Sequence, residues 1–108
     1  MVVKFTFIQL LVFFKAVTKL LSDEDVRLLE NFLLENPKAG RVIEGTGGLR
    51  KMRWAKVGSG KRGGVRVVYF WAERRAVLYF FDIYDKNEKL DLSASDKKRL
   101  AKILKELE

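Results

Sequence analysis

The first part of the chain shows two successive hydrophobic patterns. Val3, Phe5 and Phe7 alternate with polar residues, and this period of two is typical of a half-buried strand. From residue 10 to residue 21 the apolar residues recur at three- and four-residue spacing, which indicates an amphipathic helix. We therefore expect a core strand that leads directly into a buried helix.

A second helix is predicted directly after the first. Ser22 and Asp25 have the spacing of a capping box, in which side chains satisfy the free backbone N–H groups of a helix start. Asn36-Pro37 ends the helix, because a residue before proline is disfavoured in helical conformation. The apolar face between these signals consists of Val26, Leu29, Phe32 and Leu33. The two helices are expected to form a hairpin laid on a sheet.

The second half of the chain has the pattern of a strand meander. Residues 40–48 are expected to form a glycine-rich loop, followed by strands over 50–57, 65–71 and 77–84. The last two strands are almost entirely apolar, as expected for strands covered on both faces. A capping signal over 93–96 then opens a final helix with an apolar face at Leu100, Ile103, Leu104 and Leu107.

The predicted order of elements is β-α-α-β-β-β-α, which defines an α+β domain: an antiparallel sheet with an N-terminal helical hairpin and a C-terminal helix. We expect residues 1–108 to form one domain, because 108 residues with 48% hydrophobic content support one core. The apolar N-terminal run resembles a short signal peptide. However, it is too short to span a bilayer and lacks a clear cleavage site, so we expect a cytoplasmic protein with no membrane partner.

The composition restricts the chemistry that is possible. The chain has no cysteine and no histidine, which excludes disulfides, thiolate nucleophiles, the usual zinc ligands and imidazole bases. The acidic run at 23–25 is accounted for by the helix cap, so no metal site is expected there. Residues 58–62 (GSGKR) lack the spacing of a phosphate-binding P-loop. No cofactor is expected.

The positive charge of the chain is concentrated in one segment. The net charge is +8, and residues 38–75 alone carry +9. Lys51 and Arg53 share one face of a predicted strand, and Arg66 interrupts an otherwise apolar strand. Basic loop residues 61 and 62 lie between these strands, and Lys86 follows the last one. These cations could converge on one face of the sheet.

Two interpretations of this cluster are open. Lysine and arginine usually form a solvated surface. Alternatively, the crowded like charges indicate a site for an anion, which would offset their repulsion. RNA cleavage by the 2′-hydroxyl needs cations at the phosphate and proton-transfer groups. A lysine crowded by other cations gives up its proton more readily than usual and could take that second role.

Three segments resemble the HigB branch of the RelE toxin superfamily: VIEGTGGLRKMRW (42–54), GKRGGVRVVYFW (60–71) and YDKNEKLDLS (84–93). The similarity extends over most of the chain from Ser22 onward. It implies ribosome-dependent, metal-independent cleavage of messenger RNA. It also implies a cognate antitoxin, often a helix-turn-helix DNA-binding protein, so that DNA is contacted only through the complex.

The resemblance also assigns site residues. Lys51, Arg53, Arg66 and, more loosely, Lys86 take the catalytic positions, with the two arginines on the phosphate and the two lysines transferring protons. The basic neighbours expected to bind RNA are Arg50, Lys56, Lys61 and Arg62. Some RelE relatives use a tyrosine near the last helix as a base, and this chain has Asp91-Leu92-Ser93 there. Tyr84 and Asp85 are nearby candidates for the base, although no motif assigns them that role.

Two alternative functions remain at this point. The same basic face could bind RNA or the ribosome without cutting. ParE-type toxins share the architecture and act on DNA gyrase, although the LRKMRW and GKRGGVR segments favour the HigB branch.

Overall fold

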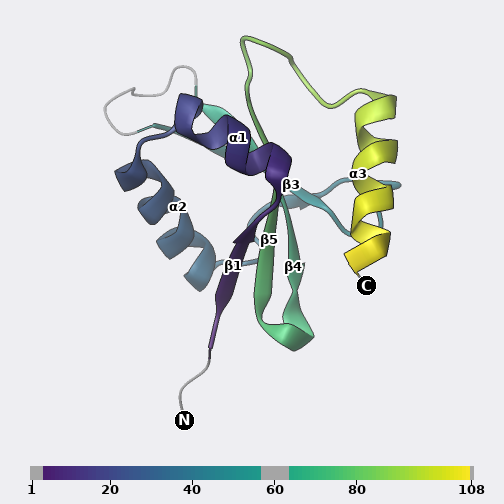
Figure 1. The fold of residues 1–108 in the computed structure, drawn as a ribbon, viewed down its shortest axis with the longest axis horizontal. Helices are drawn as coiled ribbons and strands as arrows, with labels where there is room; N and C mark the ends of the chain where they lie inside the picture. The colour runs from purple at the N-terminus through teal and green to yellow at the C-terminus, as the bar shows by residue number, and fades with distance from the viewer. Residues whose placement is uncertain (1–3, 57–63, 108) are drawn as a thin grey trace.

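The structure is a computed structural model that describes residues 4–56 and 64–107. Its helices are α1 (Leu11–Leu20), α2 (Asp23–Glu35) and α3 (Ala94–Leu107). Its strands are β1 (Thr6–Gln9), β2 (Arg41–Val42), β3 (Arg50–Trp54), β4 (Val65–Ala72) and β5 (Val77–Asp85), with a short 3₁₀ turn, η1 (Glu73–Arg75), between the last two. The predicted α+β fold class is confirmed (Figure 1).

The strands form one five-stranded sheet in the order β1-β5-β4-β3-β2. The last three strands along the chain pair antiparallel, as expected, and β2 adds to β3 in the same antiparallel sense. The first strand differs, because β1 joins the edge of the sheet parallel to β5, with Thr6 opposite Val77. The sheet is therefore mixed. The α1–α2 hairpin carries the chain away from β1 before β3 to β5 form the meander (Figure 1).

Each face of the sheet has its own apolar core. The helical-hairpin face, covered by α1 and α2, packs around Phe13, whose ring stacks on Phe80 with centroids 4.6 Å apart. The α3 face packs around Leu100 and Leu104 of α3 against Val68 and Phe81. Alternate residues of β4 and β5 thus enter opposite cores, which explains why both strands read as almost continuously apolar.

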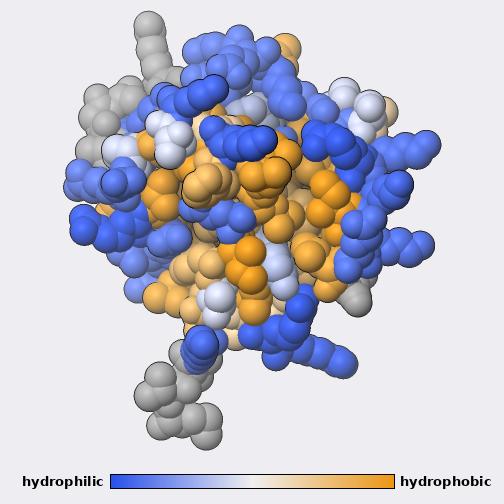
Figure 2. Space-filling view, in the orientation of Figure 1, coloured by the Kyte–Doolittle hydropathy of each residue, from blue (hydrophilic) through white to orange (hydrophobic). Residues whose placement is uncertain are grey.

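Large apolar side chains remain exposed on the two N-terminal helices. Figure 2 shows apolar residues gathered in the middle of one face with hydrophilic residues around them. Leu11 and Phe14 of α1 are 65% and 61% exposed. No helix in the described part of the chain is both long enough and apolar enough to cross a membrane.

Local signals explain where the elements begin and end. The predicted capping box at α2 is confirmed, since the Ser22 side chain accepts from the Asp25 backbone N–H while Asp25 accepts from that of Ser22. The expected loop over 40–48 was wrong at one point, because Arg41 and Val42 form β2 against β3. The strand expected over 50–57 ends at Trp54.

A β-bulge lies at the centre of the sheet. The register between β4 and β5 shifts at Val68/Tyr69, so that Val68 faces Asp82 while Tyr69 faces Phe80. Phe81 is the extra residue of β5 at this shift, and the pattern of alternating faces breaks beside it. Asp82 is thereby a buried carboxylate inside an apolar strand, with 6% of its surface exposed.

Candidate functional site

The predicted alternation of β3 places its cations on the α3 face. Met52 and Trp54 pack against the core of the helical-hairpin face, so Lys51 and Arg53 project from the opposite side. Arg53 lies directly opposite Arg66 in the antiparallel β3–β4 pair. Side chains in such a pair lie on the same face with Cβ atoms about 5 Å apart. Three of the predicted site residues are therefore brought together by strand register.

These cations border a hollow of about 560 Å³, which we call the cationic hollow. Its lining residues are Phe32, Ala39, Arg41, Lys51, Met52, Arg53, Arg66 and Leu90. Four of these carry a positive charge and none carries a negative one. The hollow therefore offers a positively charged surface with apolar patches at its border.

Lys51 has a carboxylate partner that the sequence did not suggest. Its Nζ lies 2.6 Å from Oδ1 of Asp91, which comes from the segment between β5 and α3. The hydrogen bond from Lys51 is the main reason that the pKa of Asp91 is lowered from its ordinary value. Lys51 therefore lies among cations but has one carboxylate partner, which balances its charge.

The two arginines are in a different electrostatic situation. Within residues 4–56 and 64–107, no carboxylate lies within ion-pair distance of Arg53 or Arg66. Arg53 is exposed and Arg66 is half-buried. Two guanidinium groups opposite each other, with no described counter-charge, repel each other unless an anion lies between them. This arrangement favours the anion-site interpretation over that of a merely solvated surface.

None of the other predicted residues that the structure describes lines the hollow. Arg50 lies on the opposite face of β3 and donates to the backbone carbonyls of Gly40 at 2.8 Å and Lys38 at 3.2 Å. Lys86 lies in the turn after β5 and is not among the described residues that line the hollow. Lys56 follows β3 and is half-buried. Lys61 and Arg62 lie outside the described residues.

The structure adds three residues that sequence reasoning missed. Arg41 lies opposite Lys51 in the β2–β3 pair and lines the cationic hollow. Leu90, 87% exposed, lines the same hollow, and Asp91 follows it. Arg41 belongs to a two-residue strand that is too short to give a periodic signal. The segment of Leu90 and Asp91 comes close to β3 only through the tertiary fold.

Tyr84 is an unsuitable candidate for a general base. Its ring faces Arg66 across β4 and β5 and is 4% exposed, and its buried hydroxyl has no hydrogen-bond partner among the described residues. Burial, followed by the nearby charge of Asp91, raises the pKa of Tyr84 to about 12. The phenol therefore keeps its proton at neutral pH.

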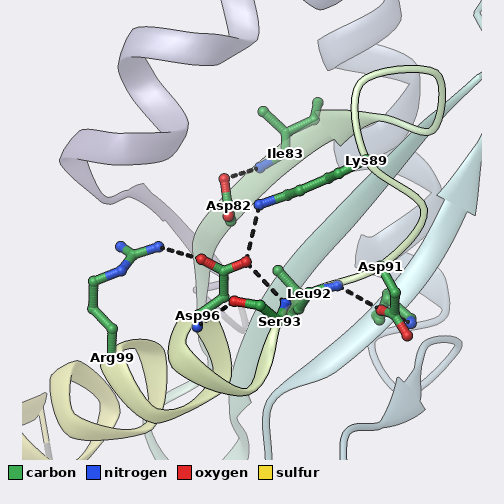
Figure 3. A network of polar contacts seen from close by, with 9 residues as sticks. Asp82, Ile83, Lys89, Asp91, Leu92, Ser93, Asp96 and Arg99 are labelled. Atoms are coloured by element: carbon green, nitrogen blue, oxygen red, sulfur yellow. Dashed lines mark hydrogen bonds and ion pairs between the residues drawn. The ribbon is translucent and has the colours of Figure 1, made fainter.

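A polar network fixes the segment that carries Asp91. Lys89 lies 3.3 Å from Asp96 and beside Asp82, while Asp96 also accepts the backbone N–H of Ser93 at 3.0 Å (Figure 3). The Ser93 N–H and the ammonium of Lys89 lower the pKa of Asp96 to about 2, whereas burial raises that of Asp82. Asp91 lies on the other side of Leu92 from this network (Figure 3). Among the described residues, no three acidic side chains are grouped as a metal site.

The fold is RelE-like. The structure is similar to that of an E. coli toxin RelE double arginine mutant in the free state, with a TM-score of 0.56 and 16% identity over 80% of this chain and 87% of that one. It is also similar to a chain of the intact E. coli RelBE toxin-antitoxin complex, with a TM-score of 0.55 and 19% identity over 74% of this chain and 94% of that one. The sequence matches no protein-family model.

Proposed function

We propose that this protein is a RelE-type toxin of the HigB branch that cleaves messenger RNA on the ribosome and is neutralised by a cognate antitoxin. The observation that carries the proposal is the Arg53–Arg66 pair, two cations in register at the cationic hollow with no described counter-charge. The likeness to the toxin RelE and to the RelBE complex supports the choice of RNA as the anion and of an antitoxin as the partner.

The proposed reaction is attack by the RNA 2′-oxygen on the neighbouring phosphorus. A bond forms between the 2′-oxygen and phosphorus, and the bond from phosphorus to the 5′-oxygen breaks. One proton leaves the 2′-hydroxyl and one arrives at the 5′-oxygen, which gives a cyclic phosphate and a new 5′-hydroxyl end.

The arginines and lysines take different parts in this reaction. Arg53 and Arg66 hold the phosphate and stabilise the negative charge that develops on it, because a guanidinium donates to two phosphate oxygens at once. Lys51 donates the proton that reaches the 5′-oxygen. Lys86 remains the proposed second proton-transfer residue, and its amine is the proposed acceptor of the proton that leaves the 2′-hydroxyl.

The antitoxin is proposed to be a helix-turn-helix DNA-binding protein, so that DNA is reached only through the complex. Because messenger RNA and the ribosome are the proposed targets, the toxin is proposed to act in the cytoplasm.

If the hollow binds RNA phosphates, the logarithm of the affinity for RNA must fall linearly with the logarithm of the salt concentration. The reason is that each neutralised phosphate releases counterions.

The test is primer extension on translated messages after induction of the wild type, Arg66→Ala and Lys51→Ala. We expect new 5′ ends and growth arrest with the wild type and their loss in both variants. Arg74→Ala is the matched control, since Arg74 is an exposed arginine of η1 outside the cationic hollow. Circular dichroism must show that the variants fold.

Three outcomes would contradict the proposal. Cleavage that persists in both variants would place the site elsewhere. Ribosome binding by the wild type without new 5′ ends would show a binding module, and DNA damage signalling with intact messages would show a gyrase-directed toxin.

A further inference from the structure

The ammonium of Lys51 has a partner with no part in the proposed reaction. Oδ1 of Asp91 lies 2.6 Å from Nζ of Lys51, forty positions away in the sequence. We propose that Asp91 is a positioning residue, which holds the Lys51 ammonium at the edge of the cationic hollow so that it can reach the scissile phosphate. This inference rests on the proposed function and adds a residue to it.

Asp91 is itself held in place by its own segment. The backbone N–H of Leu92 donates to Oδ1 of Asp91 at 2.8 Å, so the carboxylate is oriented before Lys51 approaches it. Leu92 is 5% exposed and belongs to the core of the α3 face. One residue further on, Ser93 and Asp96 exchange the two hydrogen bonds that cap α3. Asp91 is therefore attached to a stretch of backbone that is anchored by the buried side chain of Leu92 and by the cap of α3.

Fixing Lys51 matters because a free lysine side chain has many conformations. Immobilising one costs side-chain entropy. The ion pair limits that freedom in the unbound protein, before RNA arrives. A group that is already oriented transfers its proton more effectively than one that must first be ordered.

The geometry argues against Asp91 as a competitor of RNA. An ammonium has three N–H donors, and Asp91 accepts one of them. Two donors remain for a phosphate or leaving oxygen. Asp91 is also absent from the residues that line the cationic hollow, whereas Lys51 and the preceding Leu90 line it. The carboxylate therefore holds the lysine from outside the space that RNA would occupy.

The charge of Asp91 also stabilises the group of cations. Arg41, Lys51, Arg53 and Arg66 line one hollow, and their mutual repulsion opposes folding of the empty site. The lowered pKa of Asp91 keeps the carboxylate ionised throughout the neutral range. Asp91 offsets one charge at Lys51 and leaves the two arginines available to the phosphate.

The experiment compares Asp91→Asn and Asp91→Glu with Glu73→Gln on ribosomes programmed with a defined message. Glu73→Gln is the matched control, because it removes an exposed ion pair, with Lys38 at 3.0 Å, outside the hollow. Cleavage rates are measured in single turnover over a range of ribosome concentrations, which separates the rate at saturation from KM. Melting temperatures of all variants are measured alongside.

We expect Asp91→Asn to reduce the saturating rate by at least about tenfold while changing KM less than about twofold. Asp91→Glu should recover part of the rate, because it keeps a carboxylate near Lys51. The double variant Lys51→Ala/Asp91→Asn should be no slower than Lys51→Ala alone. Glu73→Gln should match the wild type in rate and KM.

Specific outcomes would overturn the inference. A lower KM or a faster rate in Asp91→Asn would show that Asp91 competes with RNA. A wild-type rate in Asp91→Asn would show that Asp91 has no role. A double variant Lys51→Ala/Asp91→Asn that is slower than Lys51→Ala would show that Asp91 acts independently of Lys51. If instead Lys51→Ala and Arg66→Ala retain full cleavage, the proposed function itself has failed at this site.

Discussion

The two faces of the sheet are built from alternate residues of the same strands, yet they differ in what they hold. The helical-hairpin face is closed by stacked aromatic rings, such as Phe13 on Phe80 and Phe5 on Trp71. The α3 face is apolar over most of β4 and β5 but carries Lys51 and Arg53 along β3 and Arg66 at the start of β4. Both faces therefore contribute core packing, whereas the cations of the proposed site lie on the α3 face alone.

The two faces differ because the helices that cover them extend over different parts of the sheet. Two helices cover the first face, and β3 contributes the apolar residues Met52 and Trp54 to that core. A single helix, α3, covers the second face, and its core includes no residue of β3. Charged side chains occupy the part of this face that lies beyond the helix. Separate substitutions should therefore change stability and activity independently.

The largest expected effect is on the first face. Phe13→Ala removes a ring that is fully buried and stacked at 4.6 Å on Phe80, so we expect the free energy of unfolding to fall by about 3–5 kcal/mol. Urea denaturation measures this loss. The cleavage rate per folded molecule should stay at the wild-type value, and a reduced rate would show that the two faces are coupled.

Gly64→Ala should affect both faces at once. Gly64 has a φ of +73°, and a Cβ there would lie 2.8 Å from the backbone oxygen of Trp54, where β3 and β4 pair. We expect a loss of about 2 kcal/mol in urea denaturation, together with reduced cleavage, because Arg66 follows two residues later. Gly45→Ala is the control, since its φ is +80° with nothing within 4 Å. Equal losses of stability in Gly64→Ala and Gly45→Ala would contradict the explanation by a steric clash with Trp54.

Asp96→Asn should weaken the cap of α3 by about 1 kcal/mol at pH 7. The pKa of Asp96 is lowered to about 2, below its unfolded value of 3.8. Its charge therefore stabilises the fold above pH 3.8, and this contribution is lost as the pH falls towards 2. Thermal melts of both proteins across this range should converge at low pH. A difference in melting temperature that does not change with pH would contradict an electrostatic origin of the stabilisation by Asp96.

Arg41→Ala should have the smallest effect. Arg41 is exposed, so we expect stability to stay within about 0.5 kcal/mol of the wild type. Because Arg41 lines the cationic hollow, its loss should lower the slope of log affinity for single-stranded RNA against log salt by about 1. Filter binding at several salt concentrations measures the slope, and an unchanged slope would exclude a phosphate contact by Arg41.

The elements that were predicted correctly depend on local signals. The capping box of Ser22 and Asp25 involves residues three apart, and the apolar faces of the helices repeat within a few turns. The parallel pairing of β1 with β5 was missed, because nothing near residue 6 records which strand it will join. β2 was missed because two residues give no period.

The same distinction holds for the site. Lys51, Arg53 and Arg66 could be grouped from alternation along two strands that are neighbours in the chain, and the structure brings these three together. Asp91 could not be grouped with them, since it meets Lys51 only after α3 docks and the segment before it is fixed. Arg50 was grouped with them although alternation places it on the opposite face.

The edge position of β1 has a consequence for the order of folding. Thr6 to Gln9 pair with residues 77–80, so β1 has no strand partner until β5 has been synthesised. Such a distant pairing closes a long loop, which slows folding relative to local contacts. Because β1 and α1 leave the ribosome before β5, their apolar residues stay without this strand until β5 follows.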